Sequence, residues 1–251
     1  MATYKKRSRK NISKSNSNAN LSSTKQVFES LDEGASKTEI FVSKYQKYLI
    51  GAISVLVLFF VLFFGYNKFI LEPKVNEANL EIFTAQKYFN QAVNTDDDSS
   101  DSLFQLSLEG ADGKFGFIDI IENYSGTPAA NLSSYYSGIA YFNLDKYDLA
   151  IEYLNDFNSN DQILSALALS TIGDSFIQLD QLDDGLNYYE KALSEASDNT
   201  FIKPLLLMKS GNIALELNKK SKARKFFQEI KEDYPDSQQA SEIEIKLAQV
   251  E

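Results

Sequence analysis

The chain has 251 residues, a formal net charge of −10 at pH 7, and neither cysteine nor histidine. The lack of both residue types excludes thiol and imidazole nucleophiles, the Ser–His–Asp triad, zinc fingers and disulfides. Carboxylates could still serve catalysis, but no pair of them stands out from an acidic surface. We therefore expect a protein that is not an enzyme and uses no cofactor or metal.

The first 47 residues are basic. Residues 1–25 contain seven Lys or Arg, no acidic residue and many Ser and Asn, a composition typical of disorder. Such a tail suits contact with anionic lipid headgroups or with ribosomal RNA or another cytoplasmic partner, and predicts no specific nucleic-acid site. Residues 26–47 carry a weak apolar stripe, which predicts a helix ahead of the next segment.

Tyr48 to Asn67 is a run of twenty residues without a charge, bounded by Lys47 and Lys68. A helix of twenty residues is roughly 30 Å long, about the hydrocarbon thickness of a bilayer. Apolar residues cover every face of this helix, so it lacks the polar stripe of an amphipathic core helix. A cleaved signal peptide would have a shorter apolar core, a shorter leader and a small-residue cleavage site. We expect a transmembrane helix at residues 48–67.

The charges on the two sides of this helix predict its orientation. Residues 1–47 carry a net charge of +6, and residues 68–251 carry a net charge of −16. The positive-inside rule places the basic flank in the cytoplasm, as a tail and juxtamembrane helix, and the rest of the chain on the far side. Tyr48 and Tyr66 lie at the two ends, where amphipathic rings prefer the headgroup layer.

Residues 68–128 are predicted to form linking helices. Pro73 predicts a break where the chain leaves the bilayer. Apolar residues three and four apart predict an amphipathic helix over residues 75–93. Two shorter helices are expected near residues 103–108 and 115–124.

Two segments of this region have a partial likeness to ligand-binding loops. Residues 94–105 have the oxygen spacing of a calcium loop, but Ser99 and Gln105 stand where an EF-hand needs Gly and Glu. Residues 110–116 are Gly-rich, but they lack the preceding strand and the Lys-Ser/Thr of a phosphate loop. We expect an acidic linker and a turn between helices, respectively.

The C-terminal half contains a repeat. Gly138, Gly173 and Gly211 stand in the same pattern, at spacings of 35 and 38 residues. After each glycine comes a small residue, then a bulky residue, then another apolar residue, at the same spacing each time. These residues are Ala150, Leu154 and Phe157; Gly185, Tyr189 and Ala192; and Ala223, Phe227 and Ile230. The small residues allow two helices to approach closely, and we expect the bulky residues to fill the space between neighbouring repeats.

This pattern resembles the tetratricopeptide repeat family, whose period is about 34 residues. The resemblance covers residues 129–236. It departs from the family at the early Trp position, where this chain has Ser134, Leu169 and Leu207, and a Pro ends only the last repeat, at Pro235. The family's antiparallel helix pairs bury their apolar faces when about three of them stack.

Helices are expected on both sides of the repeats. Apolar residues on one side of residues 237–251 predict a C-terminal capping helix. Residues 121–124 echo residues 230–234, which suggests a partial repeat within residues 68–128. The expected fold class is all-α, with an N-terminal single transmembrane helix followed by an α-solenoid of about three tetratricopeptide repeats with flanking helices.

The resemblance also implies a groove on the concave face, built from the first helix of each repeat. Carried over position by position, it includes Tyr135, Ile139, Phe142, Asn143, Asp174, Ile177, Gln178, Met208, Asn212 and Leu215. These residues include no Lys or Arg, so a clamp for a C-terminal carboxylate is disfavoured. An apolar groove with amides suits a hydrophobic peptide or a partner helix. The alternative is that these side chains contact only the next repeat or the chain's own flanking helices.

The order of segments resembles the YfgM family of Gram-negative bacteria. That resemblance implies a single-pass inner-membrane protein with a periplasmic C-terminal domain. It implies an ancillary subunit of the Sec translocon that recruits a membrane-anchored periplasmic chaperone of the PpiD type, or holds secretory polypeptide clients as they emerge. Two alternatives remain open: a periplasmic scaffold for cell-envelope or outer-membrane assembly, and an enzyme that uses carboxylates.

Overall fold

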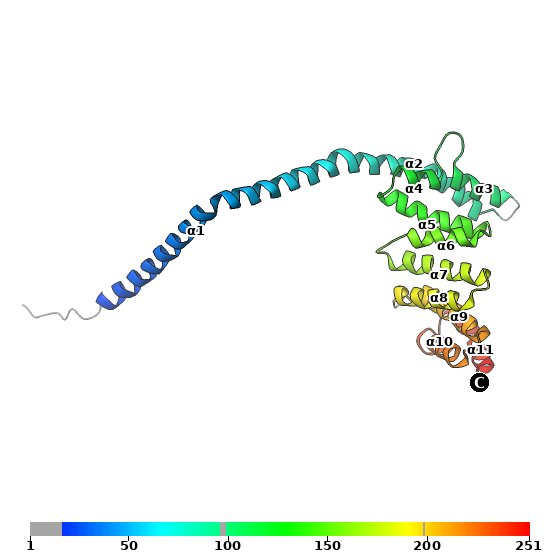
Figure 1. Cartoon of the computed structure of the whole chain (residues 1–251). Helices are drawn as coiled ribbons and strands as arrows, with labels where there is room; N and C mark the ends of the chain where they lie inside the picture. The colour runs from blue at the N-terminus through cyan, green and yellow to red at the C-terminus, as the bar shows by residue number, and fades with distance from the viewer. Residues whose placement is uncertain (1–16, 96–98, 198) are drawn as a thin grey trace, which may run out of the picture. The chain divides into compact units, whose positions relative to one another are not determined.

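The computed structural model describes residues 17–95, 99–197 and 199–251 (Figure 1). The chain divides into two compact units, residues 1–66 and residues 67–251. Regular structure in the described residues is helical, and the only extended pairing there is an isolated β-bridge between Ala111 and Lys114. The predicted all-α fold class is confirmed.

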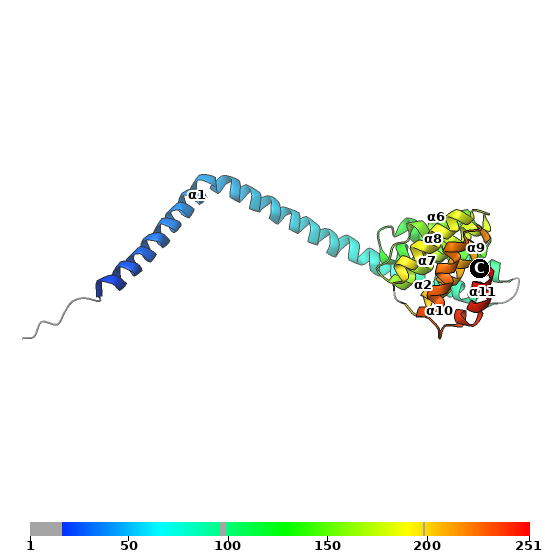
Figure 2. The same ribbon diagram turned by 90° about the horizontal axis from the view of Figure 1, so that it is seen from below.

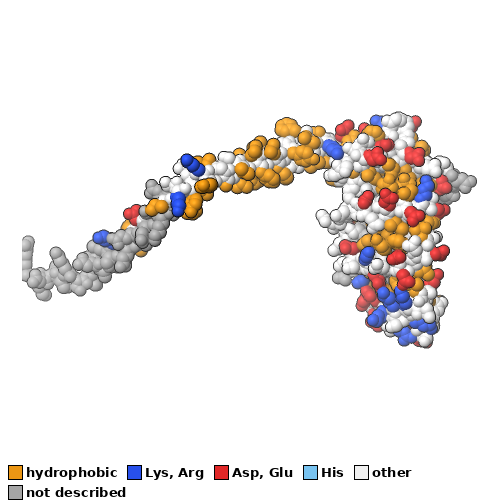
Figure 3. Space-filling model, viewed as in Figure 1, with side chains coloured by type: hydrophobic (Ala, Val, Ile, Leu, Met, Phe, Trp, Pro, Cys, Tyr) orange, Lys and Arg blue, Asp and Glu red, His pale blue; other side chains and the backbone are white. Residues whose placement is uncertain are grey.

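The first unit contains one long helix, α1, Ser17–Tyr66. In the described part of the chain, one helical stretch, Ile40–Val93, is long and apolar enough to cross a membrane by its length and composition. Its most apolar window has a mean hydropathy of 2.6, and none of that window is buried. Figure 3 shows the hydrophobic side chains along α1. An exposed apolar surface of this length needs an apolar environment.

Helix α1 begins earlier than the sequence predicts. Composition predicts disorder over residues 1–25, whereas α1 starts at Ser17. Residues 1–16 lie outside the described residues. Once the long downstream helix is nucleated, each further residue such as Leu21 adds a hydrogen bond at little cost. The helix expected over residues 26–47 lies within α1.

The break predicted at Pro73 is a change of helix type and not an end of the helical chain. A π-helical segment, η1 (Asn67–Leu71), follows α1 directly in the sequence, and α2 (Glu72–Val93) begins at once after it. Pro73 lies in the first turn of α2 and has no N–H to donate to the turn before it, so α-helical hydrogen bonding is interrupted there and the preceding turn is π-helical. The chain nevertheless stays helical.

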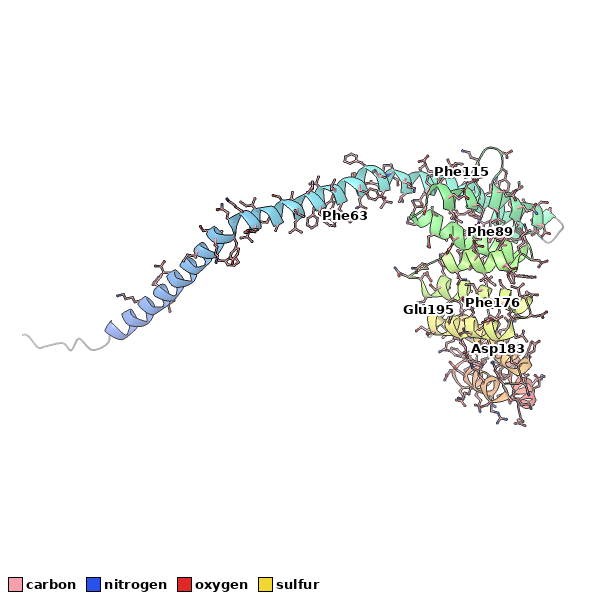
Figure 4. The ribbon with its side chains drawn as sticks, viewed as in Figure 1. Phe63, Phe89, Phe115, Phe176, Asp183 and Glu195 are labelled. Atoms are coloured by element: carbon pink, nitrogen blue, oxygen red, sulfur yellow. The ribbon has the colours of Figure 1, made fainter. Side chains whose placement is uncertain are left out.

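Helix α2 forms a cap with α3 (Ser99–Glu109) and α4 (Phe117–Asn123). The ring of Phe89 on α2 lies 5.6 Å from that of Phe104, 6.1 Å from that of Phe117 and 4.9 Å from that of Tyr136 (Figure 4). These rings join the cap to the following helix α5 in one apolar core. Residues 110–116 form the expected turn between α3 and α4.

Three helix pairs follow the cap, each lying beside the next in chain order (Figure 1, Figure 2). They are α5 (Pro128–Asn143) with α6 (Tyr147–Asp156), α7 (Gln162–Gln178) with α8 (Leu182–Ala196), and α9 (Ile202–Glu216) with α10 (Lys220–Asp233). Two first helices have side-chain N-caps. Thr127 accepts a hydrogen bond from the backbone N–H of Ala130, and Asp161 accepts from Ile163 and Leu164.

The turn inside each pair repeats as well. Asp145, Asp180 and Asn218 have left-handed φ values of 57°, 58° and 57°, at the same 35- and 38-residue spacing as the glycines. In each turn the next backbone N–H reaches a carbonyl five residues back, as from Gln181 to Phe176 at 2.9 Å. This hydrogen bond closes the first helix of each pair and directs the chain into the second.

The C-terminal segment forms η2 (Gln238–Glu242) and α11 (Ile243–Gln249) in place of one continuous helix. The side chain of Ser237 accepts a hydrogen bond from the N–H of Ala240 and starts the tighter turn. Ile243 and Val250 are buried against the last helix pair. The Arg224 guanidinium on α10 donates a hydrogen bond of 2.9 Å to the Val250 carbonyl and holds this end in place.

Candidate functional site

Each repeat glycine lies against one bulky side chain of its own helix pair. A Cβ atom at Gly138 would lie 2.3 Å from Leu154 Cγ, and one at Gly211 would lie 2.3 Å from Phe227 Cε1. At Gly173 the nearest atom would be Tyr189 Cδ1, at 2.7 Å. All three distances are shorter than any contact between non-bonded carbon atoms. The bulky residues thus lock the two helices of one pair together, a role beyond the expected filling between repeats.

The ten predicted groove residues all lie on the first helices, α5, α7 and α9. Asn143 and Gln178 are exposed, and the other eight are partly buried. The amide of Asn143 donates to the Ile139 carbonyl of its own helix, at 2.8 Å. Asn143 is therefore held along α5 and keeps its amide oxygen at the surface.

Several apolar members of the set pack within the fold. The ring of Tyr135 lies 5.1 Å from that of Phe157, and burial raises the pKa of the Tyr135 hydroxyl. Ile177 covers Gly185 on α8, where an added Cβ would lie 2.6 Å from Ile177 Cγ1. The ring of Phe142 lies 5.7 Å from that of Tyr147. Each of these contacts lies within one helix pair, so these side chains help to hold the two helices of a repeat together, which is neither a contact with the next repeat nor one with the flanking helices.

The rest of the set lies toward the C-terminal end. Met208 and Leu215 pack against the core formed by α8 to α11 and remain partly exposed. Asn212 has a buried side-chain oxygen without a hydrogen-bond partner among the described residues. The partly exposed apolar side chains fit an apolar surface, whereas the buried Asn212 oxygen is not accessible to a ligand there.

The remaining residue, Asp174 on α7, is at the centre of a polar cluster. Lys209 on α9 donates to both carboxylate oxygens, at 2.8 and 2.6 Å, and its Nζ lies 5.5 Å from the centre of the Tyr189 ring. The Tyr189 hydroxyl also donates to the Asp174 carboxylate. Burial, followed by the Asp174 charge and this hydrogen bond, raises the pKa of the Tyr189 hydroxyl.

Lys209 is a residue that the sequence analysis missed. It adjoins the groove position Met208, and the groove set itself contains no cation. The structure brings its ammonium group onto Asp174, so a lysine neutralises the one charged member of the set. The sequence feature that could have indicated this ion pair is the presence of opposite charges, Asp174 and Lys209, on the first helices of two successive repeats.

No group of His, Cys, Asp or Glu large enough to hold a metal ion occurs among the described residues. Three surface cavities of the described residues lie away from the ten groove residues, and the smallest, of about 220 Å³, lies beside α6 and α7. One of about 460 Å³ is lined by the outer face of α2, including Phe83 and Lys87. A larger one of about 700 Å³ lies at the start of α10.

Comparison with known protein families gives the same division into three helix pairs. Sequence models of the tetratricopeptide repeat match residues 133–161, 166–199 and 206–237, one segment on each pair. No curated protein matches the chain. Repeats of this kind stack into solenoids whose extended surfaces bind other proteins. The three helix pairs of this chain are therefore tetratricopeptide repeats, a kind of repeat that generally mediates protein–protein interactions.

Proposed function

We propose that this protein is a membrane-anchored scaffold that binds other proteins through its tetratricopeptide repeats. The observation that carries the proposal is the presence, on one chain, of three repeats and an apolar helix long enough to span a bilayer. The anchor is the span at residues 48–67. The basic flank lies in the cytoplasm and the repeats lie in the periplasm, as the charges on the two sides favour.

The proposed partners are the Sec translocon and a membrane-anchored periplasmic chaperone of the PpiD type. The support is the order of segments, which resembles the YfgM family: basic tail, single span, acidic domain and repeats. In this role the scaffold recruits the chaperone to secretory proteins, or holds them, as they emerge. An anchor next to the exit site raises the local concentration of the repeats there.

The proposed contact surface is the groove of α5, α7 and α9. Because Lys209 pairs with Asp174, the surface presents little net charge to a ligand. The aromatic and apolar residues Tyr135, Phe142 and Met208 suit a hydrophobic peptide or the apolar face of a partner helix. Such a surface binds many sequences with modest affinity, as a scaffold for varied clients requires.

Photo-crosslinking in living cells tests the proposal. A photoreactive amino acid replaces Phe142 or Met208, and the matched control carries it at Phe201, an exposed residue before α9 that is not in the groove set. Adducts to translocon subunits, the chaperone or secretory clients, formed from the groove positions and not from the control, support the proposal. Adducts confined to cell-envelope assembly proteins would overturn it and favour the alternative scaffold.

A further inference from the structure

The start of α10 is the most cationic part of the C-terminal unit. Five of the seven residues from Lys219 to Lys225 are Lys or Arg, within a region, residues 68–251, whose net charge is −16. Figure 3 shows these blue side chains gathered at the α10 end of the unit, with red side chains distributed over the rest. Such a cluster of positive charges in an otherwise acidic unit indicates a binding role for these side chains.

These lysines surround the cavity of about 700 Å³. Its lining comes from α8, from the turn before α10 and from the first two turns of α10. The lining residues are Glu190, Asn218, Lys219, Lys220, Ser221, Lys222, Lys225 and Phe226. The lining thus includes four lysines and one glutamate, next to the partly buried aromatic ring of Phe226.

The protein's own carboxylates satisfy only part of this charge. Lys222 pairs with Glu190 at 2.6 Å. Lys219 pairs with Asp183 on α8, which is labelled in Figure 4. Within the described ranges, Lys220 and Lys225 have no ion-pair partner, and both are exposed. The first turn of α10 also lacks a side-chain cap, so its backbone N–H groups add partial positive charge at the same end.

We propose that this cavity binds an acidic segment of a partner protein, with carboxylates on Lys220 and Lys225 and an apolar side chain against Phe226. The volume lies in the range of about 300–1,000 Å³ typical of ligand sites. Lysine binds carboxylates as a point charge without strict geometry, which suits a short flexible segment. Phe226 gives that segment an apolar contact that a simple anion would not use.

Charge favours a protein segment over an anionic bilayer as the occupant. A lipid surface is a wide sheet of negative charge, and it would meet the acidic remainder of the unit together with the lysines. A short peptide presents its charge along one narrow strip at the cavity and does not extend over the acidic remainder of the unit. At physiological salt, charges more than about 8 Å away are largely screened.

This site is separate from the proposed groove. The groove residues lie on the first helices of the pairs, whereas the cavity lies at the turn into a second helix and at its start. The proposal therefore stands independently of the translocon and of the membrane orientation. The scaffold would then bind two classes of ligand: a hydrophobic peptide or helix in the groove, and an acidic segment in the cavity.

Fluorescence anisotropy with the full-length protein in mild detergent tests the site. The probe is a fluorescein-labelled octapeptide of Asp and Glu alternating with Phe and Leu, and its control has Asn and Gln in place of the acids. We expect the acidic probe to bind and the amide probe to bind at least about fivefold more weakly. Binding should weaken as salt rises from about 50 to 300 mM.

Two double variants separate the cavity from the charge of the whole unit. Lys220→Gln with Lys225→Gln should weaken the probe about fivefold or more, and Phe226→Ala should weaken it further. The matched control, Lys87→Gln with Lys114→Gln, removes two exposed lysines outside the cavity and should leave binding unchanged. Equal loss in both double variants, or no binding of the acidic probe, would overturn the proposal. So would lysine-dependent binding to phosphatidylglycerol vesicles without binding to the peptide.

Discussion

The Asp174 carboxylate on α7 and the Lys209 ammonium on α9 form an ion pair of 2.6 Å that ties the second repeat to the third. Both side chains are partly buried, and Tyr189 from α8 donates a third hydrogen bond to the same carboxylate. One carboxylate thus joins three helices of two repeats. The pair fixes how these repeats stack and also leaves the proposed groove close to neutral.

A double-mutant cycle should show that this pair is coupled. We expect Asp174→Asn and Lys209→Met to have a coupling energy of about 1–2 kcal/mol, because charged hydrogen bonds out of water contribute more than exposed ones. The control pair, Lys231 with Glu244, has a similar distance of 2.7 Å but lies at the surface, and should couple by less than about 0.5 kcal/mol. The readout is urea unfolding of the full chain in mild detergent, followed by circular dichroism. Equal coupling in both pairs would contradict this account.

The glycine contacts predict a second result. Gly211→Ala places a methyl group against the buried ring of Phe227 and should lower the free energy of unfolding by about 1–3 kcal/mol. Gly65→Ala makes the same chemical change on α1, where the added Cβ meets nothing within 4 Å beyond its neighbouring residues and its own helix backbone, and should leave urea unfolding of the repeats unchanged. Adding Phe227→Leu to Gly211→Ala should recover part of the loss. A Gly211→Ala protein as stable as the wild type would disprove the close approach of α9 and α10.

The turns between paired helices predict opposite effects of two small substitutions. Asp180 has a φ of 58°, which glycine adopts freely and alanine adopts at a cost of about 1 kcal/mol. Asp180→Gly should therefore keep or raise stability, whereas Asp180→Ala should lower it by about 1 kcal/mol. Thermal unfolding of the two variants side by side gives the comparison. If alanine were the more stable of the two, the left-handed turn would be wrong.

The Tyr141 hydroxyl should lose its proton at a higher pH than an ordinary tyrosine. Burial, followed by the neighbouring Tyr153 to which it is hydrogen-bonded, raises the pKa of Tyr141 from its ordinary 10.0 to about 12. Because the folded pKa lies above the unfolded one, the stability from this group is full below pH 10 and is lost as pH rises toward 12. In a spectrophotometric titration at 295 nm, Tyr141→Phe should remove tyrosinate signal only near pH 12. Removal of signal near pH 10 would contradict the burial of this hydroxyl.

The repeats could be predicted from sequence because their main packing rule depends on residue size at a fixed spacing. Gly173 and Tyr189 are sixteen residues apart in one repeat, and the same combination occurs three times. The apolar run of α1 could be predicted because it needs only composition and length. Both features are local, so no knowledge of the tertiary structure is required.

The features that escaped prediction depend on relationships between elements. The partner of Asp174 is set by the stacking register of successive repeats, which the sequence of either repeat alone does not give. Pro73 predicts an interruption of α-helical hydrogen bonding, but the sequence does not show that the chain continues through it as the π-helical η1. The cationic cavity at α10 requires that Glu190 on α8 and Phe226 on α10 lie together, which follows only from the fold.

The central claim is that the repeats connect a membrane-anchored chain to partners on the far side of the membrane. Co-purification in mild detergent, with mass spectrometry of the bound proteins, tests it most directly. The full chain is compared with a deletion of residues 129–251 that keeps α1 and the linking helices. The account predicts that the full chain retains translocon subunits and the periplasmic chaperone, and that the deletion loses its periplasmic partners. A deletion that keeps every partner would contradict the account and would place the contacts in the membrane span.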